Sequence, residues 1–143
     1  MKRKLFLSIF ILLSLLLLLS ACLVTKKAGN LHVNNLLEEI KKLEDVQKVE
    51  ICKRGFSLII DVYVEEGFTK EGSLKILELA KEYLDVNTVN ELTMEFNQEY
   101  PPDTDIFIRD MDGNILFGIS GSCYESYHRG IPPDYTQYVW SIS

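Results

Sequence analysis

Basic residues, histidines and cysteines are all scarce in this sequence of 143 residues. Lysine and arginine together number 15 against 21 acidic residues, a formal net charge of −6, and there are two histidines and three cysteines. A protein that binds nucleic acid needs a basic surface to displace the counterions of the phosphates. The acidic balance therefore excludes nucleic acid as the expected partner.

The few candidate residues for thiol or zinc chemistry are poorly spaced for it. Zinc sites use closely spaced pairs of ligands, which the three cysteines do not form. Cys123, His128 and Asp134 could act as nucleophile, base and orienting carboxylate, but a fold assembles such triads and neighbours in a loop rarely form one. We expect no catalytic site, no cofactor and no bound metal ion.

Four aspartates in one stretch suggest calcium as an alternative: Asp103, Asp105, Asp110 and Asp112. Carboxylate oxygens on a tight loop are what that ion needs. With Gly113 at the sixth position of an EF-hand loop, however, the first and twelfth positions are Ile108 and Ile119. The aspartates are therefore interpreted as turn-forming residues.

The N-terminus has the pattern of an export signal. Lys2, Arg3 and Lys4 are followed by an almost unbroken apolar run from Leu5 to Leu19. That run is shorter than the roughly 20 apolar residues that span a bilayer comfortably. Residues 1–21 are therefore predicted to be a removable signal peptide rather than a membrane anchor.

The run ends in Leu19-Ser20-Ala21-Cys22, which resembles the lipobox of bacterial lipoproteins. The resemblance covers residues 1–22 and implies cleavage between Ala21 and Cys22, with a diacylglycerol on the sulfur of Cys22. It also implies a protein held at the cell membrane by this lipid anchor, on the extracytoplasmic face. The alternative is an uncleaved N-terminal membrane helix.

Cleavage would leave a short tether, residues 22–29, ahead of a single domain over 30–143. Loss of Lys2, Arg3 and Lys4 leaves 12 basic residues against 21 acidic ones, so the mature chain carries a net charge of −9. An acidic surface of this kind is typical of a solvated exported domain.

Two segments of the mature chain have the spacing of amphipathic helices. Residues 31–44 follow Asn30, and residues 70–84 follow Thr69; both are good N-cap residues. Each segment repeats apolar residues every three or four positions, so each is expected to bury one face.

Alternating apolar and polar residues predict five strands. These strands are 49–52, 58–64, 92–96, 106–108 and 115–119. Arg54-Gly55 is expected to turn the first hairpin and Asp112-Gly113 the last. Because alternating strands have one buried face, we expect an α+β fold: a two-layer sandwich with two helices on one face of an antiparallel sheet of about five strands.

The C-terminal segment 121–143 is rich in aromatic residues: Tyr124, Tyr127, Tyr135, Tyr138 and Trp140. Tyrosine and tryptophan bury a large area while keeping a polar group, so this segment is a candidate interaction surface. Alternatively, the segment covers the open edge or face of the sheet and completes the core.

Cys52 and Cys123 are a possible disulfide in an exported, oxidising environment. Closing a loop of about 70 residues would stabilise the fold by roughly 4 kcal/mol in the chain-entropy model. Cys52 shares its strand parity with Glu50 and Arg54, which indicates the outward face. Two free thiols therefore remain the alternative.

The sequence favours a membrane-anchored, non-enzymatic binding or interaction module with an envelope or membrane protein as partner. Two other classes stay open. A small-ligand or metal-ion sensor predicts a concave pocket lined by the tail aromatics. An exported thiol enzyme or hydrolase predicts a cysteine or histidine with a perturbed pKa in a cleft.

Overall fold

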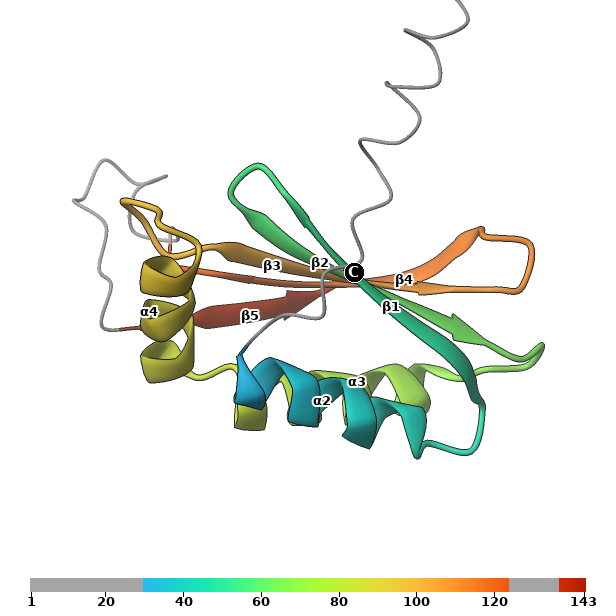
Figure 1. Ribbon diagram of the computed structural model, residues 1–143. Helices are drawn as coiled ribbons and strands as arrows, with labels where there is room; N and C mark the ends of the chain where they lie inside the picture. Colours follow the sequence, from blue (N-terminus) through green and yellow to red (C-terminus); the bar gives the residue numbers. More distant parts are fainter. Residues whose placement is uncertain (1–29, 124–136) are drawn as a thin grey trace, which may run out of the picture.

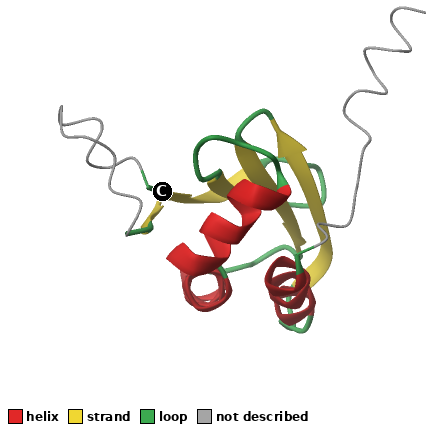
Figure 2. Cartoon of the chain, turned by 60° about the vertical axis from the view of Figure 1, so that its left-hand side comes forward, coloured by secondary structure: helices red, strands yellow, loops and turns green. Residues whose placement is uncertain are grey.

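The computed structural model describes residues 30–123 and 137–143, which form three helices and a five-stranded sheet (Figure 1). In chain order the elements are α2 (Leu31–Lys41), β1 (Val46–Arg54), β2 (Ser57–Val64), α3 (Lys70–Tyr83), α4 (Val86–Glu95), β3 (Asp103–Arg109), β4 (Ile115–Ser122) and β5 (Val139–Ile142). The helices lie on one side of the strands (Figure 2), so the predicted α+β class is confirmed.

The two predicted helices form where their caps indicated. The Asn30 side chain accepts hydrogen bonds from the backbone N–H groups of His32 and Val33, at 2.9 and 3.2 Å. The Thr69 hydroxyl accepts from the N–H of Gly72 at 3.3 Å. These contacts satisfy N–H groups that a helix leaves unpaired at its first turn, so each helix begins at its cap.

The core lies between these helices and the sheet. Strand β2 alternates without exception, and its buried residues are Leu58, Ile60, Val62 and Val64. They pack with the buried faces of α2 and α3, which include Leu36 and Ile76. The predicted hairpin before them is confirmed, and Gly55 has the positive φ of +60° that its turn requires.

The predicted strand over 92–96 is wrong, because these residues belong to helix α4 and its C-cap. The Asp85 side chain caps this helix, and Val89 and Leu92 are fully buried three residues apart on one side of it. Met94 is 76% exposed, so the alternation of Leu92, Met94 and Phe96 does not mark a buried strand face. The fold therefore has a third helix.

The sheet is mixed rather than antiparallel. Its order is β1-β2-β3-β4-β5, and β2 and β3 run parallel while all other neighbours are antiparallel. The reason is the connection: α3 and α4 return the chain to the end of the sheet where β2 begins, as a parallel pair requires. The loops that follow β2 and β3 therefore leave the sheet at the same end.

The fifth strand of the sheet, β5, comes from the C-terminal segment. It pairs antiparallel with β4, with Trp140 opposite Gly121 and Ile142 opposite Ile119. The expected total of about five strands is thus reached with a strand from the tail in place of the one predicted at 92–96.

Candidate functional site

Two aromatic residues of the C-terminal segment are packed against the domain. The rings of Tyr138 and Trp140 meet edge to face, with centroids 5.3 Å apart, and both contact the core. A Cβ atom at Gly121 would come within 2.5 Å of the Tyr138 ring and 2.9 Å of Trp140, so only glycine leaves room for this stacking. These two residues support the interpretation of the segment as sheet cover.

The Tyr138 hydroxyl is buried and hydrogen-bonded. Its oxygen lies 2.8 to 3.0 Å from the Gly121 carbonyl, the Thr104 hydroxyl and the Pro102 carbonyl. Burial raises the pKa of Tyr138 well above its ordinary value, so it stays protonated. The other three aromatic residues of the predicted surface, Tyr124, Tyr127 and Tyr135, lie outside the described residues.

The possible disulfide is not formed: Cys52 and Cys123 are not bridged in the structure. Cys52 lies in β1, and Cys123 directly follows β4, with β2 and β3 between those two strands. Three steps of about 4.8 Å separate β1 from β4, which is far more than a disulfide can bridge. Cys52 does lie on the outward face, as its parity indicated, since its neighbour Ile51 is buried.

Of the residues predicted as candidates for a catalytic triad, the structure describes Cys123 alone. His128 and Asp134 lie outside the described residues, and the described ones contain no group of three histidine, cysteine or acidic side chains placed to hold a metal ion. Asp105 accepts a hydrogen bond from the Ser120 hydroxyl at 2.9 Å. Asp110 instead bonds within its own turn, so the aspartate run is divided between strand and turn.

The turn between β3 and β4 confirms the role predicted for its aspartates. Asp110 accepts from the backbone and side-chain nitrogens of Asn114, at 2.8 and 2.7 Å, and Gly113 has φ +89°. The hydrogen bond from the Asn114 side chain, supported by backbone N–H groups, holds the pKa of Asp110 below its ordinary value. This carboxylate is therefore ionised at neutral pH.

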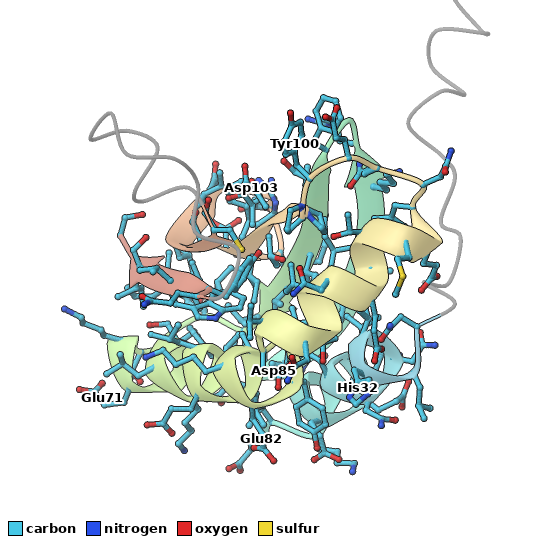
Figure 3. The ribbon with its side chains drawn as sticks, turned by 90° about the vertical axis from the view of Figure 1, so that its left-hand side faces the viewer. His32, Glu71, Glu82, Asp85, Tyr100 and Asp103 are labelled. Carbon is cyan, nitrogen blue, oxygen red and sulfur yellow. The ribbon has the colours of Figure 1, made fainter. Side chains whose placement is uncertain are left out.

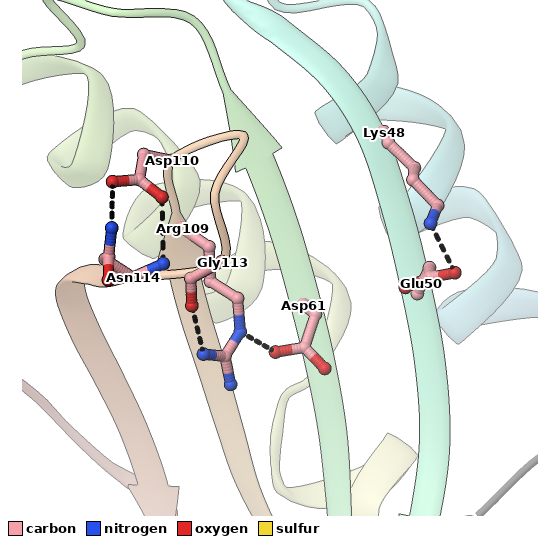
Figure 4. Close-up of polar contacts among 7 residues, drawn as sticks. All are labelled: Lys48, Glu50, Asp61, Arg109, Asp110, Gly113 and Asn114. Carbon is pink, nitrogen blue, oxygen red and sulfur yellow. Dashed lines mark hydrogen bonds and ion pairs between the residues drawn. The ribbon is translucent and has the colours of Figure 1, made fainter.

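The sheet face that carries no helices is covered by its own charged pairs. Arg109 contacts Asp61 at 2.6 Å and the Gly113 carbonyl at 3.0 Å, and Lys48 contacts Glu50 at 2.7 Å (Figure 4). The same cations lie over aromatic rings of this face: Lys48 over Tyr63 and Arg109 over Phe107, 5.0 and 5.3 Å from the centroids. These contacts pair two positive charges of the face, those of Lys48 and Arg109, within the protein.

One hollow of the described surface lies at the end of the sheet where β2 and β3 both finish. It encloses about 630 Å³. We call it the distal hollow; it is lined by Glu65, Glu66, Gly67, Phe68, Asp110, Met111, Asp112 and Leu116. Four of these residues are acidic and three are large and apolar, and Met111 and Leu116 are 63% and 42% exposed.

A second hollow, of about 380 Å³, lies beside the packed tail. Its lining includes Tyr138 and Trp140 from the C-terminal segment, and Lys81, Asp85 and Val86 from the end of α3 and the start of α4. The Asp85 carboxylate caps α4 by accepting a hydrogen bond from the Thr88 N–H. This bond is the main reason why the pKa of Asp85 lies below its ordinary value. The charge of His32 lowers the pKa of Asp85 further; both residues are labelled in Figure 3.

Sequence reasoning missed the distal hollow because its two halves are about 45 residues apart in the chain. Each half is a pair of acids just after a strand, Glu65-Glu66 and Asp110 with Asp112. A prediction of parallel β2 and β3 would have placed both loops at one edge.

No protein-family model, curated protein or solved structure matches this chain. Among the helices of the described residues, none has the length and apolar character needed to cross a membrane.

Proposed function

We propose that this chain is a bacterial lipoprotein whose acidic α+β domain is held at the extracytoplasmic face of the cell membrane and binds another protein there. The observation that carries the proposal is Leu19-Ser20-Ala21-Cys22 placed directly after a basic and then apolar leader. A diacylglycerol on Cys22 supplies two acyl chains, which together give the durable anchoring that one chain lacks.

The spacing between the lipid and the domain supports the same proposal. Residues 23–29 separate Cys22 from Asn30, the cap at which α2 begins. Seven extended residues reach at most about 25 Å, so the domain would stay close to the membrane surface. A small domain with this tether is suited to contact other proteins of the envelope.

The surface of the domain favours protein binding over chemistry on a small molecule. Met111, Ile115 and Leu116 are large apolar side chains, 42 to 63% exposed, on one projecting hairpin (Figure 1). Clustered exposed apolar side chains beside polar ones are a common feature of protein interaction surfaces.

Cys22→Ser tests the anchor. We expect this variant to remain as unprocessed precursor and to incorporate no labelled fatty acid in its native host, because serine has no thiol for lipid transfer. Cys52→Ser is the matched control: it removes a different thiol, one that is partly exposed in β1, and should leave processing and labelling unchanged. Equal labelling of wild type and Cys22→Ser, or a wild-type chain that still begins at Met1, would overturn the proposal.

A photo-crosslinking residue at position 111 tests the binding function. In living cells we expect the intact lipoprotein to form a discrete crosslinked product with an envelope protein, because the Met111 side chain is 63% exposed on the projecting hairpin. The same residue at position 78, on the outer side of α3, is the control. Crosslinking that is equal at both positions would argue against a defined protein-binding surface.

A further inference from the structure

The distal hollow combines an apolar floor with an acidic rim. Phe68, from the β2–α3 loop, and Met111 and Leu116, from the β3–β4 hairpin, present apolar side chains to it. Met111 is 63% exposed and Leu116 is 42% exposed, so both keep apolar area in contact with water. A bound partner would cover this area, which is favourable. The floor therefore favours a ligand with apolar side chains of its own.

The rim is negative: the lining residues of the hollow include four carboxylates and no lysine or arginine. Glu65 accepts a hydrogen bond from the neutral amide of Gln47 at 2.6 Å, and Asp110 bonds to Asn114. Within residues 30–123 and 137–143, none of the four rim carboxylates takes part in an ion pair, and the nearby Arg109 is engaged with Asp61. The hollow therefore has a net negative field that attracts cations.

The placement of these carboxylates favours distributed positive charge over a single ion. The rim acids come from two separate loops, and the described residues include no group of three acidic, histidine or cysteine side chains that could hold a metal ion. A chain with several lysines or arginines can pair with spaced carboxylates, while apolar residues between them reach the floor.

The hollow lies at the end of the domain opposite the start of α2, where the proposed tether would join. The tether joins α2 at its first residue, whereas the opposite end of α2 leads to Asp45, whose carbonyl accepts a hydrogen bond from the Glu65 N–H at 3.0 Å. The 11 residues of α2 span about 16 Å between these ends. Figure 1 shows the start of α2 at the left and the two loops of the hollow at the right.

We propose that the distal hollow is the docking site for a basic, amphipathic segment of a partner protein. Its lysine or arginine side chains pair with Glu65, Glu66 and Asp112, and its apolar side chains pack on Met111 and Leu116. This inference rests on the proposed function as a protein-binding module, and it adds the surface and the chemistry of the partner.

The test uses the mature lipidated protein in nanodiscs of zwitterionic phosphatidylcholine. These nanodiscs are titrated into a solution of a short fluorescent peptide of alternating lysine and leucine. Fluorescence anisotropy reports binding, with empty nanodiscs as the background. Glu66→Lys with Asp112→Lys reverses two exposed rim charges, and we expect it to weaken binding by about tenfold or more. Met111→Ser with Leu116→Ser should also weaken binding while leaving the charges in place.

The matched control is Glu78→Lys with Glu82→Lys, which makes the same change in net charge on the outer side of α3 (Figure 3 labels Glu82). We expect this control to bind the peptide within about twofold of wild type at moderate salt, because exposed charges beyond a Debye length are screened. Thermal melting of all three variants confirms that each is folded.

The inference would be overturned by rim reversal without effect, by equal weakening in the α3 control, or by wild-type binding that does not exceed empty nanodiscs. A replacement peptide with glutamate for lysine should not bind, and binding by it would also overturn the inference. Failure here is distinguishable from failure of the proposed function. If Cys22 is lipidated and position 111 crosslinks to a partner while the peptide does not use the hollow, the proposed function stands and only the basic, amphipathic character of the docked segment is wrong.

Discussion

The hydroxyl oxygen of Tyr138 lies 2.9 Å from Oγ1 of Thr104, so a residue just before the last strand contacts β3 across the intervening β4. Thr104 is fully buried, and the same tyrosine oxygen lies 2.8 Å from the Gly121 carbonyl of β4. This contact therefore holds the C-terminal strand to two others at one end of the sheet.

We expect Tyr138→Phe to lower the free energy of unfolding by about 1 to 3 kcal/mol, because it removes hydrogen bonds from the buried Thr104 hydroxyl and the Gly121 carbonyl. Urea denaturation measures the change, and Trp140, the one tryptophan of the chain, reports on β5 by its fluorescence. Tyr83→Phe is the matched control, since Tyr83 packs on the core through its ring. Equal stability of the Tyr138→Phe variant and wild type would contradict a stabilising role for the hydroxyl.

The α4 helix begins at the carboxylate of Asp85, which directly follows the helix predicted over 70–84. Asp85 accepts from the Thr88 N–H at 2.8 Å, which satisfies one donor of the first turn. We expect Asp85→Ala to lower the free energy of unfolding by about 1 kcal/mol at pH 7. Asp85→Asn should retain much of this stability, because the asparagine oxygen also accepts the bond.

The Asp85 effect has a defined dependence on pH. The pKa of this carboxyl is lower in the folded protein than its ordinary value, chiefly because of the Thr88 N–H. Its contribution is therefore complete above the unfolded pKa of about 4 and is lost as the pH falls through the folded pKa. Unfolding measured from pH 7 to pH 2 should show wild type and Asp85→Ala converging in acid, and a constant difference would contradict the prediction.

Local patterns were sufficient for α2, α3 and the β1–β2 hairpin. Asn30 and Thr69 are caps whose bonds are made within three residues, and β2 shows its burial by strict alternation. Such signals act over a few residues, so they can be read from the sequence without the rest of the fold.

The strand predicted over 92–96 is wrong because two periodicities coincide in these residues. Leu92, Met94 and Phe96 alternate as a strand would, yet Val89 and Leu92 also have helical spacing after the capping residue Asp85. Burial in the assembled core selects the helix, and Met94 is left in solvent. Tertiary packing of this kind overrides a short alternation.

The distal hollow was not predicted because of the same error. With a strand at 92–96, the sheet was expected to be antiparallel, and neighbouring antiparallel strands send their following loops to opposite ends. The observed α3–α4 crossover makes β2 and β3 parallel, which brings Glu66 and Asp112 to one hollow. The acidic pairs were visible in the sequence, but their proximity is a property of the sheet order.

The outward face of the sheet offers a last measurable relationship, between Asp61 in β2 and Arg109 in β3. Their side chains are each 23% exposed and meet at 2.6 Å, and Arg109 is also fixed by the Gly113 carbonyl (Figure 4). We expect a double-mutant cycle of Asp61→Ala and Arg109→Ala to give a coupling energy of about 0.5 to 1 kcal/mol, discounted for the solvent that reaches both groups.

The pair of Lys48 and Glu50 is the matched comparison within the same face. Its side chains are 55% and 39% exposed, and both belong to the edge strand β1. Because solvent screens this pair more strongly, its coupling should be the smaller of the two and should decline further in added salt. If the edge pair coupled as strongly as Asp61 with Arg109, burial and the second bond to Gly113 would not be what strengthens the central pair.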